Sequence, residues 1–232
     1  MFFDPFHGFY FWLLLPGLLL GLYAQIKLST TYSRYIREPL ASGLSGAEAA
    51  REILDRAGLA SVPVEEIGGH LTDHYDPTKK ALFLSSENYH ERTVAAVGVA
   101  AHEAGHALQH KAAYAPLQLR MAIVPITQFA SYAWMGITLV GMAMNMLKFI
   151  GIGIAILTVL AIFQLITLPV ELDASRRAKV QLLDLGIVQP QESQAISRVL
   201  SAAALTYVAA LVSAVMQLVR LLMIASAMRD RD

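Results

Sequence analysis

Apolar segments of membrane-spanning length are the feature of this sequence that most limits its possible folds. Residues 5–26 read PFHGFYFWLLLPGLLLGLYAQI and contain no Lys, Arg, Asp or Glu. At a rise of about 1.5 Å per residue, this run is long enough to cross a hydrocarbon core of roughly 30 Å as a helix. Comparable segments lie at about 121–147, 149–168 and 202–228. The sequence therefore predicts a mainly α-helical membrane protein with about four transmembrane helices.

Two of these segments have a second interpretation. A cleaved signal peptide carries a basic region before its apolar run. Residues 1–4 contain no Lys or Arg, so we expect the first segment to be retained as a membrane helix. The last segment contains Gln217 and Arg220, and ionisable side chains are costly inside a bilayer. Three transmembrane helices plus an interfacial helix is therefore the alternative to four.

The composition agrees with a membrane protein. Of the 232 residues, 56% are hydrophobic and only 16% are charged, whereas soluble domains carry about 25% charged residues. The 18 Lys and Arg residues balance the 18 Asp and Glu residues, so the basic patch of a nucleic-acid-binding protein is not expected. The chain has no cysteine, which leaves His, Asp and Glu as its strong metal ligands.

Charged residues between the apolar segments divide the chain into five parts. We expect a first transmembrane helix at 1–27, a soluble domain at 28–119, a transmembrane hairpin at 120–168, a helical segment at 169–201, and a C-terminal transmembrane helix with its tail at 202–232.

Basic residues beside the predicted helices indicate their orientation, because loops that carry Lys and Arg stay in the cytoplasm. No basic residue precedes the first helix, and only Lys148 in the short link after the second helix argues for the opposite orientation. Both soluble parts are therefore expected in the cytoplasm. The six basic residues that support this are Lys27, Arg34, Arg37, Arg176, Arg177 and Lys179.

The soluble domain at 28–119 begins with a predicted helix, LSGAEAAREILDRAGL at 44–59. Ser45 and Glu48 have the spacing of a capping box, and Gly58 stands where a helix-ending glycine belongs. Short β-rich runs at 62–85 then predict a small sheet with a hairpin. A long buried helix should follow, with Asn88 as its N-cap.

This long helix carries the stretch AAHEAGHALQH at 100–110. His102 and His106 are four residues apart, so both imidazoles project from one helical face and can reach one cation. Glu103 can take the proton of a water whose pKa the metal has lowered, which makes a nucleophile for an amide carbonyl. This pattern is typical of zinc metalloproteases. A structural polar network is the alternative, although these side chains are costly to bury in an apolar helix without partners.

A catalytic zinc ion usually has three protein ligands, so a third must come from elsewhere in the chain. His110 is rotated by about 40° and lies roughly 6 Å further along a straight helix, so we expect it outside the ligand set. We expect His70, Asp73 and His74 to be solvated hairpin residues. Glu171 is the best candidate, because it follows a membrane span at a helix start marked by the proline two residues before it.

Four blocks of sequence, in order, carry a resemblance to a known family. They are SGLSGAEAAREILDRAGL, GGHLTDHYDPTKKALFLS, AAHEAGHALQH and LPVELDASRRA. Together they resemble the YugP-like neutral zinc metallopeptidases, which are bacterial membrane proteins, and the match covers nearly the whole chain from the first span onward. The resemblance implies a small α+β zincin-like domain with an HExxH active-site helix and one Zn²⁺ per chain.

The resemblance also implies the third ligand. In the broader gluzincin proteases of the HtpX and prenyl-protease type, that ligand is a glutamate on a later helix, followed four residues on by an aspartate. Glu171 takes the place of this glutamate beside His102 and His106, and Ser175 stands where the aspartate would be. Asp173 would orient a zinc histidine only on an irregular helix. Because residues two apart on a helix point about 200° from each other, we expect Asp173 to pair instead with Arg176 or Arg177.

In such proteases an extended substrate pairs with an edge strand above the metal. The candidate edges in this sequence are residues 80–85 and the facing residues 70–74. A downstream tyrosine or histidine usually helps to polarise the substrate carbonyl. Tyr207 is the only later tyrosine and therefore the candidate. An aromatic anchor at the membrane interface is its alternative role.

We therefore expect a multi-pass cell-membrane zinc endopeptidase with Glu103 as its general base and its active site facing the cytoplasm. Its substrates would be peptides or membrane-protein segments in contact with the lipid bilayer. The alternative is a non-hydrolytic metal-binding scaffold or a degenerate protease homologue, but a purely structural metal site has no need of Glu103. A transporter is not favoured, because the first three spans have no ionisable side chain in their middles.

Overall fold

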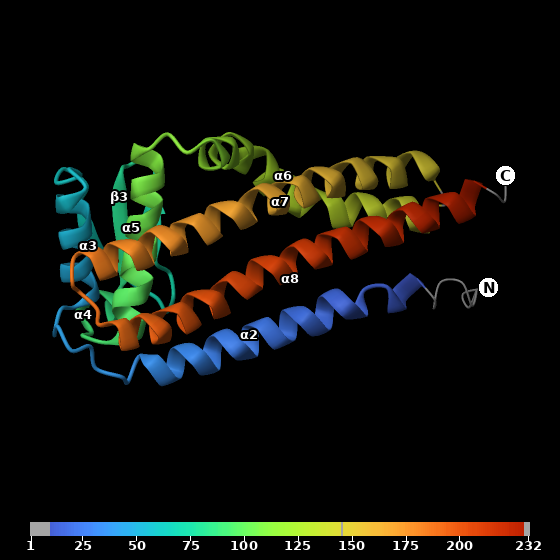
Figure 1. Cartoon of the computed structure of the whole chain (residues 1–232). Helices are drawn as coiled ribbons and strands as arrows, with labels where there is room; N and C mark the ends of the chain where they lie inside the picture. The colour runs from blue at the N-terminus through green and yellow to red at the C-terminus, as the bar shows by residue number, and fades with distance from the viewer. Residues whose placement is uncertain (1–9, 145, 230–232) are drawn as a thin grey trace. The chain divides into compact units, whose positions relative to one another are not determined.

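The computed structural model describes residues 10–144 and 146–229, which are mainly helical and include one small sheet (Figure 1). In chain order the elements are α2 (Leu15–Tyr35), α3 (Gly46–Arg56), β1 (Val64–Ile67), β2 (His74–Asp76), β3 (Ala81–Ser85), α4 (Ser86–His90), α5 (Val94–Lys111), α6 (Ala115–Ala143), α7 (Leu147–Asp184) and α8 (Pro190–Arg229).

Among the described residues, four helices are long and apolar enough to cross a membrane. They are the helical segment Tyr10–Tyr35, which includes α2, together with α6, α7 and α8. This finding agrees with the prediction of a mainly α-helical membrane protein with about four spans. The α7 and α8 helices have 38 and 40 residues, whereas about 20 residues cross a bilayer. Both helices therefore continue beyond their apolar segments into polar sequence.

The described residues form two compact units. The first unit consists of residues 10–25, 119–144, 146–168 and 206–229 and contains the apolar lengths of the long helices. The second consists of residues 26–118 and 169–205 and contains the sheet, α3, α4, α5 and the polar ends of α2, α7 and α8. Each unit has a buried apolar core of its own.

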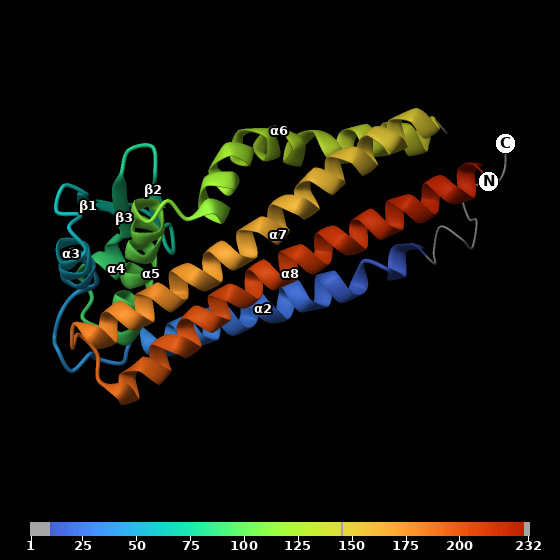
Figure 2. The same cartoon turned by 45° about the horizontal axis from the view of Figure 1, so that its top comes forward.

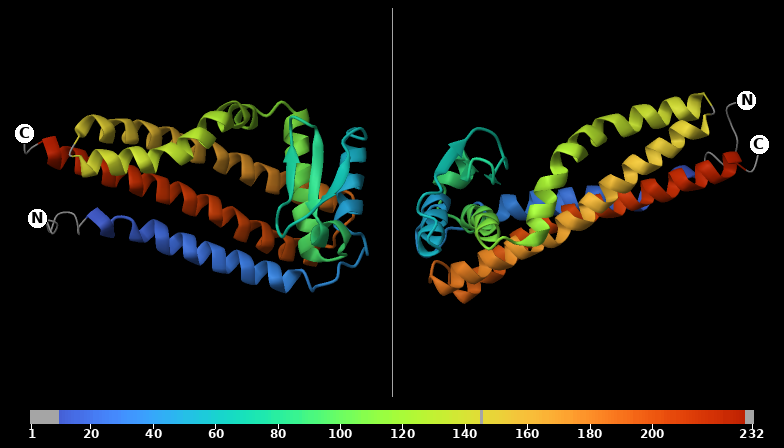
Figure 3. Two further views of the ribbon diagram at one scale, coloured as in Figure 1. Left: turned by 180° about the vertical axis from the view of Figure 1, so that it is seen from behind. Right: turned by 90° about the horizontal axis from the view of Figure 1, so that it is seen from above.

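The sheet of the second unit has three strands in the spatial order β1-β3-β2 (Figure 2). The β1 strand is parallel to β3, and the β2 strand forms an antiparallel hairpin with β3, which confirms the predicted hairpin. The α5 helix packs against β2 and β3, as the left view of Figure 3 shows from behind. Because β3 is the central strand and pairs with a strand on each side, residues 80–85 cannot form the open sheet edge that we expected as a candidate site for substrate pairing. The outer strands are β1 and β2.

The α3 helix forms as predicted. The Ser45 side chain accepts a hydrogen bond from the Glu48 backbone N–H at 3.2 Å, and the Glu48 carboxylate accepts one from the Ser45 N–H at 2.7 Å. Gly58 follows the C-cap residue with a φ of +69°, a left-handed conformation that glycine adopts without strain. The buried face of α3, which includes Ile53 and Leu54, packs against α5 in the core of the second unit.

The long helix begins later than predicted. Asn88 is not its N-cap but lies inside the short helix α4, and α5 begins at Val94 after the capping residue Thr93. Thr93 forms an isolated antiparallel β-bridge with Pro39. This tertiary contact holds the chain extended between α4 and α5, and the local sequence does not reveal it.

The predicted helix start near Glu171 is also wrong. Pro169 lies inside α7, which continues from the apolar segment to Asp184. A proline inside a helix removes one backbone hydrogen bond, but helices that cross membranes tolerate this because nearby groups satisfy the freed carbonyl. Glu171 is therefore carried on one continuous helix rather than on a separate segment.

The α5 and α7 helices cross very closely at Gly105. A Cβ atom at Gly105 would lie 2.5 Å from the Ala174 carbonyl oxygen, a distance that real Cβ atoms do not adopt. Only glycine allows the two backbones to approach this far. Gly105 lies beside His106, and Ala174 lies three residues after Glu171, so this crossing fixes the separation of the two helices that carry the candidate metal ligands.

We predict that Gly105→Ala destabilises the protein by about 1–3 kcal/mol, because the new methyl group forces the two helices apart. Gly98→Ala on the same helix is the matched control: its Cβ would meet the Ile196 side chain at an ordinary 3.4 Å, and alanine is the better helix former. Thermal unfolding of both variants in detergent measures the difference. Equal unfolding temperatures for the two variants would contradict the close crossing.

Candidate metal centre

The α5 helix presents His102, Glu103 and His106 inside the second unit. Most of this helix is buried, and Glu103 and His106 are each 8% exposed. Glu171 reaches the same place from α7 and is only 2% exposed. Buried ionisable groups of this kind require partners of opposite charge or a metal ion.

His102, His106 and Glu171 converge on one point. Glu171 Oε2 lies 3.2 Å from His102 Nε2 and 3.6 Å from His106 Nε2, and one ligand atom from each of the three residues lies within 4.8 Å of the others. Zinc bonds of about 2.0–2.2 Å in a tetrahedral arrangement separate neighbouring ligand atoms by about 3.3–3.6 Å. The two distances from Glu171 Oε2 are close to this spacing, and two imidazoles and a carboxylate are a ligand set that suits zinc.

Gln109 determines which nitrogen of His106 carries the proton. The Gln109 side-chain NH₂ donates to the Val170 carbonyl at 2.8 Å and to Asp173 Oδ2 at 3.0 Å. Its Oε1 therefore faces His106, whose Nδ1–H donates to it at 3.0 Å. With the proton on Nδ1, the Nε2 of His106 keeps a free lone pair toward the candidate metal position.

Ser175 supports the other histidine. Its hydroxyl lies 3.1 Å from His102 Nδ1 and accepts a hydrogen bond when that nitrogen carries the proton. Ser175 is the position where the resemblance to gluzincin proteases would place an aspartate, so the partner of His102 here is a neutral hydroxyl. The Nε2 of His102 then also faces the point where Glu171 converges.

Asp173 pairs with both arginines that follow it, as predicted. Its carboxylate accepts from Arg177 Nε at 2.6 Å and from Arg176 Nη2. Asp173 does not converge with the two histidines, but it does more than form a surface ion pair, because it also accepts from Gln109. It thereby supports His106 indirectly, a role that the sequence did not suggest.

Glu103 lies beside this group but bonds to a strand. Its Oε2 accepts a hydrogen bond from the Tyr75 backbone N–H of β2 at 3.0 Å. Burial raises the pKa of Glu103 to about 7, because a charged carboxylate loses its hydration there. A carboxyl group with a pKa near neutrality can both accept and release a proton under physiological conditions.

The same hydrogen bond shows which way the outer edge of β2 faces. Tyr75 lies opposite Leu82 of β3 in the antiparallel pair, yet its N–H donates to Glu103 of α5. The β2 edge therefore faces the helix that carries the histidines. The Tyr75 hydroxyl and His110 Nδ1 share a hydrogen bond of 2.9 Å, so His110 also contacts this strand and lies outside the converging group, as expected.

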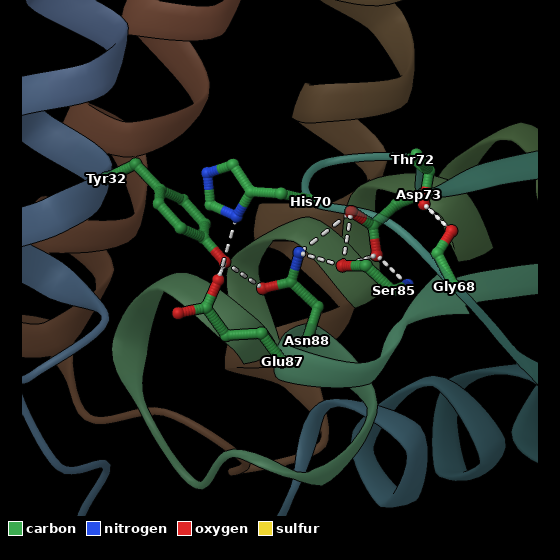
Figure 4. A network of polar contacts seen from close by, with 8 residues as sticks. All are labelled: Tyr32, Gly68, His70, Thr72, Asp73, Ser85, Glu87 and Asn88. Carbon is green, nitrogen blue, oxygen red and sulfur yellow. Dashed lines mark hydrogen bonds and ion pairs between the residues drawn. The ribbon is translucent and has the colours of Figure 1, made fainter.

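A network of polar side chains holds the chain just before β2 (Figure 4). Asp73 accepts hydrogen bonds of 2.8 Å from the Ser85 backbone N–H and from the Asn88 side chain. Asn88 is fully buried, and its Oδ1 lies 2.8 Å from the hydroxyl of Tyr32 on α2. Asp73 is thus a half-buried anchor of the loop and not the solvated residue that we expected.

His70, in the loop before β2, and His74, the first residue of β2, have partners of their own. His70 Nδ1 lies 3.2 Å from Glu87 Oε2 (Figure 4). The His74 ring stacks on Phe83 with a centroid distance of 5.0 Å, and its Nδ1 lies 2.9 Å from the Thr72 carbonyl oxygen. Both are exposed, in agreement with the expectation.

Tyr207 lies on α8 in the first unit, whereas the converging group lies in the second unit. Its expected contact with a substrate carbonyl therefore stays a prediction.

Gln109 is the residue that reasoning from the sequence missed. Its spacing of three residues after His106 placed it on the same helical face and could have indicated a supporting role.

Comparisons with known proteins agree with this geometry. Residues 10–226 match the family described as "Putative neutral zinc metallopeptidase". The chain is 44% identical over 223 residues to the "Putative membrane protease YugP" of Bacillus subtilis (strain 168), and the alignment covers 96% of this chain and 99% of that protein. No solved structure matches the chain significantly. The family match over nearly all described residues and the near full-length relative together show that this chain belongs to the neutral zinc metallopeptidase family.

Proposed function

We propose that this protein is a membrane-embedded zinc endopeptidase in which His102, His106 and Glu171 hold one zinc ion and Glu103 is the general base. The observation that carries this proposal is the convergence of three zinc-type ligand atoms beside a buried carboxyl group. The family membership and the name of the Bacillus relative support the same reaction class. A purely structural metal site would have no use for Glu103.

Zinc, when bound, would supply a Lewis acid that polarises the substrate carbonyl and lowers the pKa of a water molecule. Glu103 takes the proton from the attacking water and later delivers it to the leaving amine. Gln109 and Ser175 hold the two imidazoles in the tautomer that offers Nε2.

A peptide substrate would bind along the outer edge of β2 as an added strand. The edge faces α5 at Tyr75, whose N–H is bonded to Glu103 in this structure. Main-chain hydrogen bonds to such an edge supply affinity with little demand on substrate sequence. The substrate carbonyl would thereby be brought next to the general base.

Glu103→Gln is expected to keep the zinc and the fold but to lower peptide cleavage at least about a hundredfold, because Gln cannot accept the proton. The amide oxygen of Gln can still accept the Tyr75 N–H, so the local structure is preserved. Metal analysis, thermal unfolding and a peptide cleavage assay on the same preparation provide the three readouts. Cleavage at a near wild-type rate would refute the protease assignment.

A second pair of variants tests the third ligand. Glu171→Ala should lose zinc and activity together, whereas Asp173→Ala should keep most of its zinc because Asp173 supports His106 only through Gln109. Both residues are acidic, lie on the same helix and are at most 10% exposed at their side chains. Zinc content per chain after purification decides the matter, and zinc retained by the Glu171 variant but lost from the Asp173 variant would reverse the assignment.

We also propose that the second unit faces the cytoplasm. Six basic residues lie within or just after the polar ends of α2 and α7, and loops that carry such residues stay in the cytoplasm.

Labelling of introduced cysteines tests this orientation. The chain has no cysteine, so single cysteine variants report one position each. Arg56→Cys and Arg176→Cys, at side chains that are 69% and 67% exposed, should resist membrane-impermeant thiol reagents in intact cells. Lys148→Cys, at the second residue of α7, should react. The opposite labelling pattern would invert the topology.

A further inference from the structure

A cavity of about 740 Å³ lies in the second unit between the polar ends of α2 and α8, which run side by side in Figures 1 and 2. The lining residues described for it include no carboxylate. Its cationic groups come from Lys27 and Arg34 on α2 and from Arg198 on α8, and its Ser and Thr hydroxyls come from Thr30, Thr31, Ser197 and Ser201.

Tyr35 contacts two of these cations. Arg198 Nη1 donates to the Tyr35 hydroxyl at 3.1 Å, and the Arg34 guanidinium lies over the Tyr35 ring at 5.3 Å from its centroid. Tyr35 itself is buried. Within residues 10–144 and 146–229, neither arginine has a carboxylate partner. Two guanidinium groups that contact Tyr35 and have no carboxylate partner among the described residues make the cavity complementary to an anion.

The donors indicate which anion fits. Guanidinium groups and hydroxyls are the side chains that bind phosphate oxygens, and arginine does so with paired N–H donors. Four hydroxyl-bearing Ser and Thr residues line the cavity in addition to the three cations. This donor set matches a phosphate group with several free oxygens.

The position of the cavity along the two helices indicates the source of the phosphate. Lys27 directly follows the apolar run at 5–26, and Ser201 directly precedes the apolar segment at 202–228. Both helices are candidate membrane spans, so the cavity lies at the depth where a bilayer places its headgroups. Basic pockets between membrane helices at this depth bind anionic lipid headgroups.

We propose that this cavity binds the headgroup phosphate of an anionic phospholipid. The site shares no residue with the His102, His106 and Glu171 group. It therefore does not depend on the proposed peptidase activity, and its test needs no catalytic assay. The bound lipid would tie the polar ends of α2 and α8 together at the surface of the membrane.

The test is a titration of the full-length protein in detergent with phosphatidylglycerol or with zwitterionic phosphatidylcholine, followed by native mass spectrometry. Wild type should bind phosphatidylglycerol more tightly than phosphatidylcholine, and added salt should weaken the difference. Arg34→Gln and Arg198→Gln should each weaken phosphatidylglycerol binding about fivefold, and the double variant about 25-fold, because each basic residue at a membrane surface contributes to this extent.

Arg56→Gln is the matched control, because Arg56 is an exposed arginine on α3 outside the cavity; it should bind phosphatidylglycerol like wild type. Arg34→Gln leaves the bond between Arg198 and Tyr35 intact, so it decides the matter if Arg198→Gln does not fold. Unchanged binding in the cavity variants, or equal binding of the two lipids by wild type, would overturn the proposal. Inorganic phosphate that binds as tightly as phosphatidylglycerol would identify a soluble ligand and overturn the lipid assignment.

Discussion

The close crossing of α5 and α7 at Gly105 is the contact on which the candidate metal centre depends. One helix carries two imidazoles and the other carries the carboxylate that converges with them. A side chain at Gly105 would collide with the backbone at Ala174, so the helices could not approach to ligand-bonding distance. The small residue within the His-Glu-x-x-His motif therefore has a structural role that is separate from the chemistry of its neighbours.

Hydrogen bonds then orient the two histidines in different ways, one from α7 and one from α5 itself. His102 has a hydroxyl partner in Ser175, whereas His106 has an amide partner in Gln109, which is itself held by Asp173 and a backbone carbonyl. Ser175, four residues after Glu171, offers His102 a hydroxyl and not a carboxylate. The nearby carboxylate of Asp173 acts instead through Gln109 on the second histidine.

The second unit contains two further features besides this centre, the outer edge of β2 and a basic cavity between α2 and α8. The β2 strand turns its outer edge toward α5, and a network from Tyr32 through Asn88 to Asp73 holds the chain before that strand (Figure 4). Tyr32 and Tyr35 both come from the polar end of α2. One turn of this helix thus contributes to the support of the β2 loop and to the basic cavity beside α8.

The sequence by itself determined the spans, the α3 helix with its capping box and the His-Glu-x-x-His pattern, because apolar length, capping and helical spacing are local properties. Glu171 and the edge strand were only candidates at that stage, and only the tertiary structure brought Glu171 to the histidines and placed β3 at the centre of the sheet. The start of α5 at Val94 and the support of His106 by Gln109 and Asp173 also required the structure. Each of these depends on contacts between residues that are far apart in the chain, such as Thr93 with Pro39 and Gln109 with Asp173, and no local pattern encodes such pairings.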